Sequence, residues 1–125
     1  MMKTYLQAAA LTCCFLIGCK ASPPITRNDL IGEYVYKVED SKDAPTGHEF
    51  DHLTLRADGK YELIQGGLAQ PKTQTTGVWT VWAGNGDGPR VVLGHSGYPP
   101  RIVNGEVRLM ISYDNGIWYA KIKKN

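Results

Sequence analysis

Apolar and polar residues alternate over short stretches, and signals for tight turns separate these stretches. Within residues 30–38, for example, Tyr34, Tyr36 and Val38 fall at every second position. This spacing predicts a β-strand with one buried face. The same reasoning, together with short apolar runs, predicts further strands over residues 50–57, 60–64, 78–83, 90–94, 98–103, 107–111 and 117–122. The chain therefore reads as about eight short strands with no helix.

The turn signals favour antiparallel neighbours along the chain. Asp58-Gly59, Asn104-Gly105 and Asn115-Gly116 each join two predicted strands, and such pairs are typical of two-residue hairpin turns. Pro99-Pro100 interrupts the strand at residues 98–103, so we expect that strand at a sheet edge. Turns every ten or so residues predict an antiparallel barrel or sandwich, which makes the fold class all-β.

Aromatic residues are frequent, and packing in the core and between strands accounts for most of them. Trp79 and Trp82 are three residues apart, so on a strand they point to opposite faces. One of them should lie outside or at a rim, where it could contact a partner. His95 and Tyr98, with Ser96 between them, form a second polar and aromatic stretch without a catalytic motif around it. The candidate partner-binding residues are therefore Trp82, His95 and Tyr98.

The first residues have the architecture of a secretory leader. Lys3 precedes a mostly apolar stretch over residues 5–17, which is shorter than the roughly 20 residues that a membrane span needs. The stretch ends in Leu16-Ile17-Gly18-Cys19, which resembles a bacterial lipobox. The resemblance implies cleavage before Cys19 and acylation of this residue, with palmitate among the added chains. The alternative is an ordinary signal peptide that leaves Cys19 as a free thiol.

This leader sets the expected organisation of the chain. Residues 1–18 form the lipoprotein signal peptide, residues 19–28 the lipidated Cys and a Pro-rich tether, and residues 29–125 one β-barrel domain. The resemblance places the protein in the bacterial cell envelope, anchored to a membrane through Cys19. Lys20 stands where the family's sorting signal for the inner membrane has Asp, which favours the outer membrane. The three cysteines all lie at positions 13, 14 and 19, so the domain has no disulfide.

Two short patterns also resemble lipocalin-like bacterial lipoproteins. Residues 30–34, LIGEY, open the domain as a Gly-x-Trp strand opens lipocalins, with Tyr34 in place of Trp. Residues 53–61 then carry Leu-x-Leu-x-x-Asp-Gly-x-Tyr, and Gly77-x-Trp79 follows. The resemblance covers residues 29–123 and implies a small antiparallel up-and-down barrel. It implies no ligand and no activity, because such folds host many functions.

Residues 48–52 read His-Glu-Phe-Asp-His, which matches the pattern of zinc proteases. That chemistry needs a helix, on which His48 and His52 share a face and Glu49 acts as the base. On a strand, residues four apart are separated by about 13 Å, too far to share a metal ion. The surrounding pattern predicts a strand, so the preferred interpretation is a polar entry into it. An adventitious metal site at His48 and His52 is a further alternative.

Charge and composition narrow the function classes. The formal net charge is +2 and Lys3 is the only charged residue of the leader, so nothing predicts binding to nucleic acid. We expect a monomeric, non-enzymatic binding module without a cofactor, for an envelope protein or a small apolar ligand. A first alternative is an inhibitor or immunity protein against a lytic enzyme or toxin, acting through residues 40–47 and 84–88. A second alternative is a zinc metalloprotease.

Overall fold

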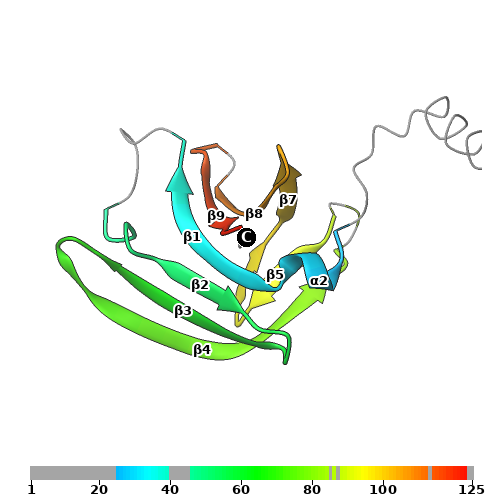
Figure 1. Cartoon of the computed structure of the whole chain (residues 1–125), viewed down its shortest axis with the longest axis horizontal. Helices are drawn as coiled ribbons and strands as arrows, with labels where there is room; N and C mark the ends of the chain where they lie inside the picture. Colours follow the sequence, from blue (N-terminus) through cyan, green and yellow to red (C-terminus); the bar gives the residue numbers. More distant parts are fainter. Residues whose placement is uncertain (1–24, 40–45, 85, 87, 113, 124–125) are drawn as a thin grey trace, which may run out of the picture.

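Nine strands and one helical turn make up the described part of the computed structural model, which comprises residues 25–39, 46–84, 86, 88–112 and 114–123. Figure 1 shows the strands curving around a common interior. The elements are α2 (Arg27–Leu30), β1 (Gly32–Val38), β2 (His52–Leu55), β3 (Lys60–Gly67), β4 (Gln70–Trp82), β5 (Arg90–Leu93), β6 (Ser96–Tyr98), β7 (Pro100–Val103), β8 (Glu106–Ser112) and β9 (Ile117–Lys121). All strand pairs are antiparallel, and the strands follow the order β6-β5-β4-β3-β2-β1-β9-β8-β7 across the sheet.

The sheet forms a nearly closed antiparallel barrel, which confirms the predicted fold class. β1 pairs with β2 on one side and with the last strand, β9, on the other. At the opposite side, β6 pairs with β5 and β7 pairs with β8. Pro99 separates β6 from β7, and its carbonyl accepts a hydrogen bond of 2.9 Å from the Met110 N–H. The single strand predicted over residues 98–103 is thus divided at Pro99 into the end of β6 and the whole of β7, which are the two end strands of the sheet.

Large side chains fill the barrel interior. Alternate residues point inward, as the pattern in β2 predicts: Leu53 and Leu55 are fully buried. The two tryptophans confirm the prediction of opposite faces, since Trp79 is buried and Trp82 is 46% exposed. The buried cluster consists of Leu30, Tyr34, Leu53, Leu55, Tyr61, Leu63, Trp79, Val91, Leu93, Leu109 and Tyr119.

One helical turn, α2, packs against this core at the start of β1. Thr26 caps the turn: its hydroxyl accepts from the Asp29 N–H, and the Asp29 carboxylate accepts from the Thr26 N–H at 2.8 Å. Hydrogen bonds from the Thr26 backbone and side chain lower the pKa of Asp29. Leu30 enters the core, and the Tyr34 hydroxyl donates to the Leu30 carbonyl at 2.6 Å. The Arg27 guanidinium lies 4.0 Å from the centre of the Trp79 ring.

The sequence predicted a strand from residue 30 and a tether through residue 28. A single turn is too short to show a helical period, so α2 was missed. Ile25 is partly buried against the core as well, so contacts with the barrel begin before residue 29.

The hairpin turns agree with the predictions in part. Asn104-Gly105 has φ of 53° and 78°, which confirms a type I′ turn. Asn115-Gly116 does not form one: Ser112 pairs with Ile117 across residues 113–116, and in this pair only Gly116 has positive φ. Asp58-Gly59 also differs, because a hydrogen bond from the Arg56 N–H to the Lys60 carbonyl closes a three-residue loop with Gly59 at φ 86°.

β4 is longer than the sequence predicted. Only residues 78–83 were expected to form a strand, whereas the structure begins it at Gln70. The missed part, residues 70–77, contains no large apolar residue and shows no alternation, and residues 70–76 are all exposed. The long strand is the lowest one in the view of Figure 1. The outer half of β4, residues 70–77, is therefore held by pairing with β3 and not by burial in the core.

Candidate functional site

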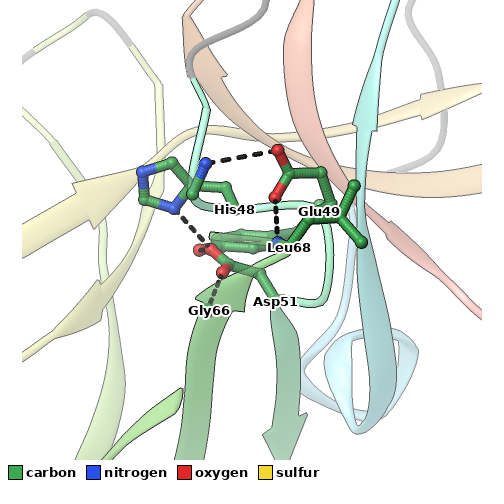
Figure 2. Close-up of polar contacts among 7 residues, drawn as sticks. His48, Glu49, Asp51, Gly66 and Leu68 are labelled. Atoms are coloured by element: carbon green, nitrogen blue, oxygen red, sulfur yellow. Dashed lines mark hydrogen bonds and ion pairs between the residues drawn. The ribbon is translucent and has the colours of Figure 1, made fainter. Parts of the chain in front are cut away.

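A buried carboxylate lies where the turn before β2 meets β3 and β9. Asp51 is 2% exposed. Its carboxylate accepts hydrogen bonds from the Gly66 N–H at 3.1 Å and the Tyr119 hydroxyl at 3.2 Å. A further hydrogen bond of 2.9 Å joins it to His48 Nδ1, as Figure 2 shows. We call His48, Asp51, Gly66 and Tyr119 the Asp51 cluster. The three partners satisfy this buried charge, as burial requires.

Aromatic rings surround the Asp51 cluster. The His48 ring stacks on Tyr36 with centroids 5.4 Å apart, and Tyr119 meets Tyr36 and Tyr98 edge to face at 6.2 and 5.9 Å. Burial, followed by the charge of Asp51, raises the pKa of Tyr119 and also that of Tyr36. Tyr119 therefore stays protonated at neutral pH and keeps donating to Asp51. The cluster and its rings join five separate parts of the chain: β1, the turn before β2, β3, β6 and β9.

Glu49 fixes the turn beside this cluster. Its carboxylate accepts from the Gly47 N–H and from the Leu68 N–H, each at 3.3 Å (Figure 2). Hydrogen bonds from backbone N–H groups, first its own and then that of Gly47, lower the pKa of Glu49. The side chain that zinc chemistry would use as a base thus holds the turn to the β3–β4 hairpin.

The two histidines of the His-Glu-x-x-His pattern serve different partners. His48 lies in the turn and contacts Asp51, whereas His52 begins β2 and its Nε2 lies 3.5 Å from Glu33 Oε1. Within the described ranges, no three His, Cys, Asp or Glu side chains gather closely enough to hold a metal ion. The pattern therefore has the conformation of a turn and a strand, not that of the helix that zinc proteases require.

The three candidate partner-binding residues lie on different elements and differ in exposure. Trp82 is exposed at the end of β4, on the face opposite to buried Trp79. His95 is exposed in the turn between β5 and β6. Tyr98 is half-buried and packs its ring against Tyr119 of the core. Only Trp82 and His95 are available to a partner at the surface.

The edge of β4 was missed by sequence reasoning. β3 pairs with β4 between Gln70 and Val78, whereas β5 pairs only with residues 79–82 of β4. No strand of the described residues lies along the other side of residues 70–78. Figure 1 shows β4 at the bottom of the view, with β5 joining it only near its end. The Thr-rich composition of this part, favourable for strands, was the available signal.

Alternation in the ladder determines which backbone groups face that edge. The Trp79 N–H donates to the Gly59 carbonyl at 2.8 Å. In an antiparallel pair, every second residue bonds the same neighbour. Gly77 and Thr75 therefore bond β3, while Gln74 and Thr76 direct their N–H and C=O groups to the unpaired side.

A shallow hollow of about 490 Å³ lies on the outer face beside this edge. Thr76 and Val78 of β4 line it together with Thr54 of β2 and Glu62 of β3. Val78 is 65% exposed, and the Gln74 amide donates to the Glu62 carboxylate at 2.8 Å. The edge and the hollow form one continuous surface of polar groups around one apolar side chain.

Several expected features lie outside the described residues. They are the lipobox with Cys19, residues 40–45 of the first loop proposed for an inhibitor, and residues 85 and 87 of the second. None of the described helices is long and apolar enough to cross a membrane.

Comparison with protein families, curated proteins and solved structures finds no match to this chain.

Proposed function

We propose that this chain is a lipid-anchored envelope protein, without enzymatic activity, that binds another protein through its outer surface. The observation that carries the proposal is the filled interior of the barrel. Barrels of about eight strands either hold one small ligand or are filled by side chains. Here Tyr34, Trp79 and Leu109 are fully buried among the core residues, which favours a protein partner over a small apolar ligand.

The chemistry of the Asp51 cluster supports a non-enzymatic role. A catalytic carboxylate or histidine needs a free position toward a substrate. Asp51 instead accepts from three groups of its own chain, and its side chain has no exposed surface. These bonds anchor the turn at residues 46–51 and leave the carboxylate no lone pair directed to solvent.

The anchor rests on the lipobox-like sequence. Acylation at Cys19 with two or more chains gives stable membrane attachment, and Lys20 after it favours the outer membrane. The domain then acts at the membrane surface, where its outer strands and turns meet other envelope proteins. An inhibitor of a lytic enzyme or toxin is one form that such binding takes.

Photo-cross-linking in living cells tests the proposal. A photoreactive phenylalanine is placed at exposed Trp82 or His95 in the full chain, and Cys19→Ala is the matched control for the anchor. We expect light-dependent adducts of discrete mass in the membrane fraction, lost or strongly reduced in the control. Recovery of a hydrolase or toxin in the adduct would identify the inhibitor form.

The competing function, binding of a small apolar ligand, is tested on the same protein by native mass spectrometry after mild extraction from membranes. We expect the chain to carry no lipid or other small apolar molecule beyond its covalent acyl chains. Stoichiometric retention of such a molecule, with no protein adduct from either position, would contradict the proposal and identify a carrier of small ligands.

A further inference from the structure

We infer that the unpaired edge of β4, residues 72–78, pairs in antiparallel fashion with the same edge of a second copy of this chain. The proposal replaces the monomer that the sequence led us to expect, and it does not depend on which partner the outer surface binds. The starting observation is that β5 covers only residues 79–82 of β4. The backbone groups of Gln74 and Thr76 thus face a side on which no described strand lies.

Proteins usually protect such an edge with charge, Pro or a bulge. β4 has such devices at its outer end only, namely Pro71 and Lys72, and its register with β3 shifts there, between Gln65 and Gly67 of β3. Residues 73–78, Thr-Gln-Thr-Thr-Gly-Val, contain no charge and no Pro. They form an extended segment about 20 Å long, and no strand of the described residues lies along its outer edge.

The segment is complementary to itself. Since Gln74 and Thr76 present their backbone groups to the edge, a twofold axis between two copies of Thr75 brings Gln74 of one copy opposite Thr76 of the other. Thr75 then faces its own equivalent, and Thr pairs across strands are favourable. This register satisfies the exposed N–H and C=O groups of both copies with the same bonds.

Charge and exposure fit the same register. Lys72 is the only charged residue of the segment, and it faces Val78 of the other copy instead of a second Lys72. The aliphatic part of a lysine side chain covers apolar surface while its ammonium group stays in water. Lys72 thereby covers Val78, which is 65% exposed in the single chain. A second copy therefore fits this edge without like charges in contact.

Disulfide cross-linking in membranes tests the pairing on the full chain. Thr75→Cys places a thiol at the expected twofold axis. Thr80→Cys is the matched control, because Thr80 is exposed on the same strand but pairs with Val92 of β5. After oxidation, we expect a disulfide-linked dimer from Thr75→Cys and none from Thr80→Cys. Equal dimer bands, or no dimer band from Thr75→Cys, would overturn the inference.

A second variant separates pairing from folding. Thr76→Pro removes an N–H that faces the edge and leaves the bonds of Thr75 and Gly77 to β3 in place. Added to Thr75→Cys, it should abolish the dimer band while the tryptophan fluorescence stays that of the native fold. A dimer band that survives Thr76→Pro would also overturn the inference. A disulfide-linked band that contains this chain and a different protein would likewise overturn the inference. It would assign the edge to the partner of the proposed function.

Discussion

Removing the Asp51 carboxylate should destabilise the fold more than any comparable change to an acidic residue at the surface. Asp51→Ala takes away the acceptor for the Tyr119 hydroxyl and the Gly66 N–H. Both donors are buried, so water does not replace the lost acceptor. His48 is partly exposed and can bond water instead. The change therefore leaves two buried donors without a partner.

The expected magnitude follows from those two groups. A buried donor left unsatisfied costs about 1–3 kcal/mol, so Asp51→Ala should lower the free energy of unfolding by about 3 kcal/mol. This is a large part of the roughly 5–15 kcal/mol that holds a domain folded. Asp51→Asn keeps one acceptor oxygen but places an amide N–H₂ among donors, and we expect a loss of about 2 kcal/mol for it.

Urea unfolding, followed by the tryptophan fluorescence of Trp79, Trp82 and Trp118 together, measures these free energies. Asp114→Ala is the control, because Asp114 is exposed in the turn before β9, and it should change stability by less than about 0.5 kcal/mol. The double variant with Tyr119→Phe should lose less than the sum of the single variants, because phenylalanine needs no acceptor. Stability of Asp51→Ala equal to that of the control would refute this account of the cluster.

Three further changes test other parts of the fold. Burial raises the pKa of Tyr34 and Tyr119 above the value of about 10 in the unfolded chain. The stability that depends on their protonated forms is therefore complete below about pH 10, and above it the free energy of unfolding should fall by up to about 1.4 kcal/mol per pH unit for each tyrosine. Urea unfolding between about pH 8 and 11 would measure this decrease. Tyr119→Phe should reduce that slope, and a flat profile would contradict the assignment. Gly77→Ala places a Cβ 2.9 Å from Tyr61 Cε1, which should cost about 1–3 kcal/mol in thermal unfolding, whereas an unchanged midpoint would show that the ring moves freely. Thr26→Ala should cost about 1 kcal/mol through the lost cap, and Thr26→Ser, which keeps the hydroxyl, should remain near the native midpoint.

The strands that face the core could be predicted from the sequence because burial leaves an alternating pattern. β2 shows this most clearly, since Leu53 and Leu55 are both inside. The outer half of β4 could not be predicted in this way. Residues 70–76 are all exposed and are held by pairing with β3, so this part of the strand has no apolar period. For the same reason, no strand was predicted over these residues.

The position of Asp51 could have been found by the same period. It lies two residues before Leu53 and therefore in phase with the inward face of β2. A charge in that phase predicts a buried carboxylate that needs donors. The His-Glu-x-x-His pattern drew attention to His48 and His52 instead, because a motif is recognised by residue type alone. The pairing of Asp51 with Tyr119, 68 residues away, depends on closure of the barrel, which local pattern does not contain.

The inward face of β4 contributes to stability, whereas the unpaired backbone edge of the same strand is the site proposed for association. The two contributions can be tested separately. On β4, Trp79 lies inside the barrel, where its indole N–H donates to the Arg56 carbonyl at 2.8 Å. Gln74 and Thr76, on the exposed half of the same strand, contact neither the core nor β5 through their backbone edge. Substitution of Trp79 should lower stability, and association should fall only as far as the folded fraction does. Thr76→Pro should abolish association at native stability. If binding took place in the interior, substitution of core residues would change stability and association together. Binding at the outer edge keeps the two properties independent, so these two variants show whether the interior or the edge of β4 carries the association.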